Sequence, residues 1–167
     1  MSPRVRFLGH PAHVVLTDFP IALWVTSVLA DGLTLGFGPS PWERWAFGCL
    51  ALGLLMAVPT ILTGLLDYLA LPADHPAVRA ATVHMTLMLT ATGAFTTSLV
   101  LRVGVSPPTG VRWLAALVFS GAGLAALVVG GWWGGELVLR YGVGTRVFDF
   151  SGVRPQDRPI DEHASGE

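Results

Sequence analysis

Residues 113–135, WLAALVFSGAGLAALVVGGWWGG, form an uncharged stretch that decides what kind of fold this chain can adopt. A second uncharged stretch covers residues 45–66, WAFGCLALGLLMAVPTILTGLL. A bilayer core of roughly 30 Å is crossed by about 20 apolar helical residues, and a helix in a soluble core is seldom apolar for so long. Both stretches therefore predict transmembrane helices.

Two further stretches are apolar but contain polar residues. Residues 80–101 have no formal charge and include one interior histidine, His84. The first stretch is interrupted by Asp18 and Asp31, and the arginines before it also resemble the start of a secretory signal. Because Asp18 and Pro20 break the smooth apolar segment that a signal needs, we expect a membrane helix here too.

The sequence therefore predicts an all-α fold, an integral membrane bundle of four antiparallel helices. The helices are expected at about residues 11–35, 43–70, 77–103 and 111–140, and short loops rich in Gly and Pro join them. Residues 1–145 would form the transmembrane domain, and residues 146–167 a polar C-terminal tail.

The composition agrees with a membrane protein and excludes several functions. Of the 167 residues, 52% are hydrophobic and 13% are charged, whereas an average soluble domain has about 25% charged residues. The net charge is -1, so nucleic-acid binding is excluded as a main role. The sequence has no Gly-rich phosphate loop, no Cys-x-x-Cys pair and no nucleophile elbow, so nucleotide hydrolysis, thiol redox chemistry and acyl transfer lack support.

The arginines predict how the bundle is oriented in the membrane. Four spans put both termini on one side, together with the loop between the second and third helices. Positively charged loops tend to stay in the cytoplasm, so we expect both termini there. The arginines on the side of the termini are Arg4, Arg6, Arg79, Arg140, Arg146, Arg154 and Arg158, against Arg44, Arg102 and Arg112 on the other side.

Small residues at helical spacing predict where the helices pack. Such residues let two helix backbones approach closely in lipid. On the second helix they are Gly53, Ala57, Thr60 and Gly64, with Asp67 next on the same face, and on the fourth helix they form two pairs, Gly130 with Gly134 and Gly131 with Gly135.

Polar residues collect at one end of the predicted bundle. In an antiparallel arrangement the start of the first helix, the end of the second, the start of the third and the end of the fourth share one membrane face. His13 and His84 lie at similar depth there and could face each other across the bundle. The residues at this end are His10, His13, Asp18, Asp67, His75, His84, Glu136 and Arg140.

Two kinds of cofactor site fit this cluster, and the spacing does not choose between them. A pair of imidazoles on facing helices is what a b-type haem needs, with His13 and His84 as axial ligands and His10 as the alternative on the first helix. A divalent metal ion could instead be held by His10, His13, Asp18 and His84. Asp67, Glu136 and Arg140 would then be supporting groups around the ligands.

Plain structural roles are available to the same residues. His10 could cap the first helix, His13 could be an interfacial histidine, and Glu136 with Arg140 has the spacing of an intrahelical ion pair. Asp31 lies about 27 Å from His13 along the helix, at the opposite membrane surface, where we expect a hydrogen-bonding or capping role.

Four segments together resemble a known family. They are Gly9-His10-Pro11-Ala12-His13 followed by Asp18-Phe19-Pro20, then Leu62 to Tyr68, then His84 early in its span, and finally Gly131 to Gly144 with Gly-Gly-x-Leu-Val. The chain resembles the bacterial four-helix membrane proteins grouped as domain of unknown function 2231, over about residues 7 to 147. The family usually has a histidine where this chain has Asp18, and often an Asn shortly after the histidine of the third helix, which this chain lacks.

The resemblance implies a bacterial inner-membrane location and favours electron transfer, because some family members are similar in layout to two-haem cytochromes. We therefore expect a haem b or metal site that passes electrons to a membrane redox partner, rather than a stand-alone enzyme. Two other hypotheses stay open. One is a module that binds or transports metal ions or protons without redox chemistry, and the other is a structural subunit of a membrane complex.

Overall fold

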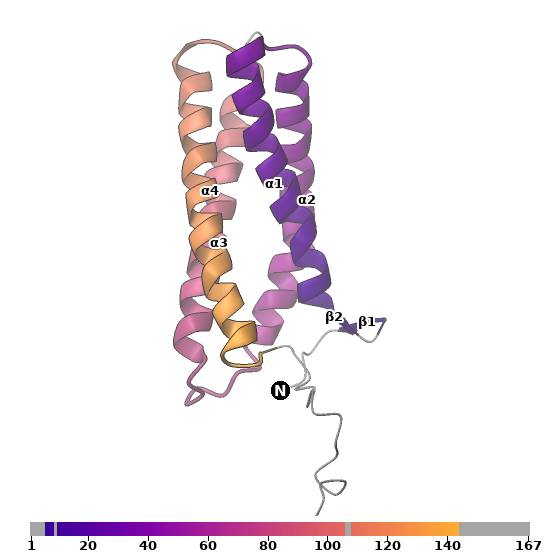
Figure 1. The fold of residues 1–167 in the computed structure, drawn as a ribbon, viewed down its shortest axis with the longest axis vertical. Coiled ribbons are helices and arrows are strands. Elements are labelled where there is room, and N and C mark those ends of the chain that lie inside the picture. Colours follow the sequence, from indigo (N-terminus) through magenta and orange to yellow (C-terminus); the bar gives the residue numbers. More distant parts are fainter. Residues whose placement is uncertain (1–5, 9, 106–107, 144–167) are drawn as a thin grey trace, which may run out of the picture.

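The protein is a bundle of four long helices, as expected (Figure 1). A computed structural model describes residues 6–8, 10–105 and 108–143, so the tail expected at 146–167 lies outside the described residues. The helices are α1 (Ala12–Phe37), α2 (Trp42–Tyr68), α3 (Val78–Arg102) and α4 (Gly110–Leu139). Each is long and apolar enough to cross a membrane. Their ends lie within one or two residues of the expected ones.

A short antiparallel pair of strands precedes α1, and the sequence analysis did not expect it. Strand β1 (Arg6–Phe7) pairs with β2 (His10–Pro11), with Phe7 opposite His10. The pair turns through Leu8, which has a positive φ of 48°. As a result the backbone of His10 belongs to a strand, and α1 begins at Ala12 without a side-chain cap, so His10 does not cap the helix.

The four helices form two hairpins. The most extensive packing is between α1 and α2 and between α3 and α4, and smaller contacts of α2 with α3 and of α1 with α4 close the ring. Helices α1 and α3 thus lie on a diagonal of the bundle and meet through side chains at its centre. There, the rings of Trp24 and Phe95 stack with centroids 4.7 Å apart.

The second hairpin repeats the first. Three buried residues of α1 have buried counterparts in α3 at an offset of 71 positions: Trp24 in Phe95, Ser27 in Ser98 and Asp31 in Arg102. Ser27 in α1 donates a hydrogen bond to the Ala46 carbonyl at 2.8 Å, and Ser98 in α3 donates one to the Ala116 carbonyl at 2.8 Å.

The aromatic residues at the centre follow the same repeat. Trp24 lies against Gly53 of its own hairpin, and its counterpart Phe95 lies against Gly123. Because each repeat contains two helices, both repeats run through the membrane in the same direction. They are related by a pseudo-two-fold axis parallel to the helices, a common arrangement in membrane proteins with internal repeats.

A buried ion pair joins the two hairpins at the end remote from the termini. Arg102 binds both carboxylate oxygens of Asp31, at 2.5 and 2.7 Å. Arg102 also donates hydrogen bonds to Ser98 at 3.2 Å and Ser120 at 3.1 Å. Asp31 thus has the hydrogen-bonding role expected of it, and its partner is the arginine that the sequence analysis had counted among the loop charges.

One of the two glycine pairs that were expected to pack against another helix does not do so. Gly53, Ala57 and Thr60 are buried between helices, and Gly130 is buried in α4. Gly131 is exposed, and a side chain at Gly131 or Gly135 would meet no atom within 4 Å among the described residues. The face of α4 that carries Gly131 therefore points out of the bundle.

Candidate functional site

His13 is held in the first turn of α1 by the neighbouring helix. Its Nδ1 is 2.9 Å from the carbonyl oxygen of Thr60 in α2. The ring lies against Gly64, where a side-chain carbon would be 2.7 Å from His13 Cε1. Only glycine leaves enough room for the imidazole at this point, so the α1–α2 packing fixes both the position and the direction of the ring.

His84 is held in the same way by the second hairpin. Its Nδ1 is 2.8 Å from the carbonyl oxygen of Gly130 in α4. A side-chain carbon at Gly134 would be 3.0 Å from His84 Cε1. His84 is the counterpart of His13 in the internal repeat, and Gly130 and Gly134 are the counterparts of Thr60 and Gly64.

These hydrogen bonds determine which ring nitrogen is free. A carbonyl oxygen can only accept, so Nδ1 of both histidines must carry the proton and donate it. In the neutral imidazole Nε2 then has its lone pair available. Both side chains are half-buried, and the internal repeat puts them at equivalent positions in the two hairpins. The site thus presents two equivalent imidazoles, each able to bind through Nε2.

The other predicted ligands do not join this pair. His10 and Asp18 are both exposed on the outside of the bundle. Among residues 6–8, 10–105 and 108–143, no group of three or more His, Cys, Asp and Glu side chains is close enough to hold a metal ion. Of the four candidates, only His13 and His84 are half-buried, whereas His10 and Asp18 are exposed.

The model of the family described as "Predicted membrane protein (DUF2231)" matches residues 9–147, which include both hairpins and both histidines. The chain belongs to this family. No curated protein and no solved structure matches this DUF2231 protein.

Two of the groups expected to support the ligands pair with each other in this DUF2231 protein. Glu136 and Arg140 form the expected i,i+4 ion pair at 3.6 Å, and the Arg140 side chain is largely exposed. Asp67 is half-buried in the last turn of α2. The backbone carbonyls of Thr60 and Gly130 orient the imidazoles.

The sequence analysis recognised Thr60, Gly64, Gly130 and Gly134 only as packing residues. Their role beside the histidines becomes visible only when the two halves of the chain are compared. The repeat itself was the available signal, since His13 with Gly64 recurs as His84 with Gly134.

Proposed function

We propose that this membrane protein holds a b-type haem between His13 and His84 and carries electrons to or from a membrane partner protein. The observation that supports this is the pair of equivalent imidazoles, each with Nδ1 bonded to a carbonyl and Nε2 free. Histidines that bind metal typically donate their other ring N–H to a carbonyl or carboxylate, which fixes the tautomer and the ring orientation.

The number of donors favours haem over a divalent ion. A haem iron already has four ligands from its ring, so two imidazoles complete its coordination. Zinc in proteins takes at least three protein side chains. The described residues offer no third histidine, cysteine or carboxylate at this point. A bound haem would supply a one-electron redox centre, which is the chemistry that electron transfer needs.

The chain's own residues would set the properties of such a site. The bonds to the Thr60 and Gly130 carbonyls orient the rings and increase the electron density on Nε2. Gly64 and Gly134 give the rings space against the second helix of each hairpin. Because the two halves are equivalent, neither histidine should dominate binding.

The test is an absorption spectrum of the detergent-purified protein, oxidised and dithionite-reduced, after expression with ample haem. We expect a Soret band and sharpened reduced bands at about one haem per chain. His13→Gln and His84→Gln should each remove the bands while the protein stays inserted and monodisperse. His75→Gln, in the loop at the same end, is the matched control and should keep them. A colourless protein, or bands that survive in both variants, would overturn the proposal.

The location of the site in the cell is part of the same proposal. Arg79 and Arg140 lie at the histidine end of the bundle, whereas Arg44 and Arg112 lie at the other end. Arg102 is also at that other end, but its charge is neutralised by Asp31 inside the bundle. This pairing strengthens the arginine bias toward the histidine end, so we place the histidines near the cytoplasmic face of a bacterial inner membrane.

A further inference from the structure

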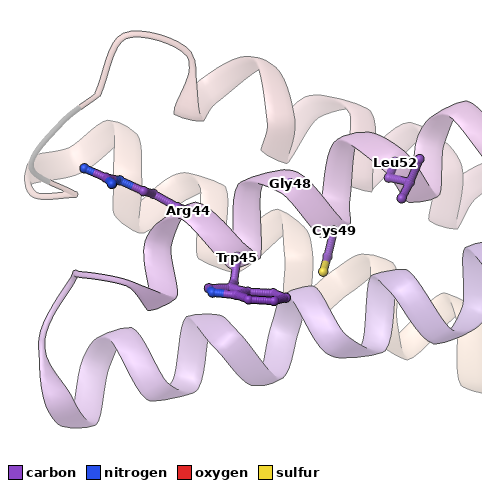
Figure 2. A pocket seen from close by; sticks show the side chains of 5 residues that line it. All are labelled: Arg44, Trp45, Gly48, Cys49 and Leu52. Atoms are coloured by element: carbon purple, nitrogen blue, oxygen red, sulfur yellow. The ribbon is translucent and has the colours of Figure 1, made fainter.

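A shallow, open groove lies on the outer face of α2, at the end of the bundle opposite the histidines. It has a volume of about 470 Å³. Figure 2 shows its residues on one side of the helix, with the Arg44 side chain extending toward the helix end. The lining residues are Arg44, Trp45, Gly48, Cys49 and Leu52.

The polar end of the groove carries a positive charge that is available to a ligand. The side chain of Arg44 is exposed and forms no ion pair or hydrogen bond with the described part of the chain, whereas the backbone N–H of this residue is bonded to the Pro41 carbonyl. The other arginines at this end differ, because Arg102 binds Asp31 and Arg112 donates to the Val103 carbonyl. A guanidinium at the end of a membrane span lies at the depth of the lipid phosphates and can bind one with two parallel hydrogen bonds.

The rest of the groove is apolar and extends into the span. From Arg44 to Leu52 it follows two turns of α2, or about 12 Å. Gly48 forms the floor, where a side chain would meet no atom within 4 Å. Trp45 is 61% exposed beside it, and an indole at a helix end prefers the interface between headgroups and acyl chains. The shape suits one extended hydrocarbon chain that lies along the helix below a charged headgroup.

We propose that this groove binds an anionic phospholipid, with its phosphate on Arg44 and one acyl chain along Gly48 and Leu52. The site is independent of the histidine pair, because it lies at the other end of the bundle and on its outer face. The lipid proposal can therefore be tested independently of the proposed haem site.

Native mass spectrometry of the full-length protein, titrated with phosphatidylglycerol, tests the proposal. Arg44→Gln removes the charge and Gly48→Leu fills the floor, and each should weaken binding of the tightest lipid about tenfold. Arg112→Gln and Gly93→Leu are matched controls, since Gly93 is another exposed helical glycine with open space around it. Equal binding by all four variants would overturn the proposal, as would equal binding of uncharged diacylglycerol by the wild type.

The single cysteine gives a second readout at the site itself. Cys49 is the one cysteine of the chain and lines the groove. Phosphatidylglycerol should slow its modification by a maleimide at least several-fold in the wild type, and less in Arg44→Gln. Glycerol phosphate, which has the charge but no acyl chain, should give no protection. Unchanged modification with phosphatidylglycerol, or equal protection by glycerol phosphate, would rule out an acyl chain in the groove.

Discussion

Asp31 and Arg102 show how one pair of residues can hold the two halves of the protein together. They occupy equivalent positions in the internal repeat, but one is acidic and the other basic. Only 4% of Asp31 and 8% of Arg102 is exposed. A buried ion pair is tolerated when its remaining donors and acceptors are also bonded, and Ser98 and Ser120 accept two further guanidinium hydrogens.

Removing one charge of this pair should destabilise the protein strongly. Asp31→Asn or Arg102→Gln leaves the other charge buried without its counter-ion, at a cost of about 3–5 kcal/mol. Thermal unfolding in detergent should show a large drop in the midpoint for each single variant. The double variant Asp31→Leu with Arg102→Met removes both charges and should recover most of the loss. Single variants that unfold at the wild-type temperature would contradict the assignment.

The sequence predicted that the two histidines lie at the same end of the bundle, but it did not predict the ion pair. His84 was conspicuous because a histidine inside an apolar span needs a reason, and its depth matched that of His13. Arg102 was not conspicuous, since it ends its span and looked like a loop charge. Whether such a residue turns inward depends on a partner from a helix far away in the sequence, and neither span alone contains that information.

For whole helices too, some properties follow from the sequence of each span and others depend on the neighbouring helices. Their number and ends follow from apolar length, because a span must cover the bilayer core. Their rotation does not, because lipid is as apolar as the protein interior and the helices have no hydrophobic face to orient them. The sequence therefore could not distinguish Gly130 and Gly134, which pack inward, from Gly131 and Gly135, which meet no other helix.

Helix contacts at the glycines predict a ranking of stabilities. A side-chain carbon at Gly53 would lie 2.6 Å from the Trp24 ring, and one at Gly123 would lie 3.1 Å from the Phe95 ring. Gly53→Ala should therefore cost about 1–3 kcal/mol, and Gly123→Ala less. Gly121→Ala points into open space and should stabilise α4 slightly, by up to about 1 kcal/mol. Unfolding midpoints in one detergent check the order, and a reversed order would mean that α1 and α2 pack differently.

The orientation of the whole molecule in the membrane can be measured. If the histidine end is cytoplasmic, the loop between α2 and α3 faces the cytoplasm and the loop between α1 and α2 faces outward. In a Cys49→Ser background, a membrane-impermeant maleimide added to intact cells should label Ser40→Cys and not Asp74→Cys. Lysed cells, in which both positions are accessible, are the control. The opposite labelling pattern would place the histidines on the outer side.

The division into two hairpins predicts that the chain can be cut between them. Each hairpin has its own extensive packing, and the cross-axis contacts of Trp24 with Phe95 and of Asp31 with Arg102 join the two. Fragments 1–72 and 73–167, co-expressed, should therefore assemble in the membrane and co-purify through a tag on either one. A failure to assemble, with both fragments inserted, would show that the connecting loop is essential.

The charges also predict which fragments pair. Two copies of 1–72 would bring Asp31 against Asp31, and two copies of 73–167 would bring Arg102 against Arg102. Like charges buried together are strongly unfavourable, so the ion pair should select the mixed assembly over either self-pairing. Asp31→Arg alone should abolish co-purification, and Asp31→Arg with Arg102→Asp should restore it. Restoration would show that the opposite signs at these two equivalent positions make one chain, rather than a dimer of identical hairpins, the stable unit.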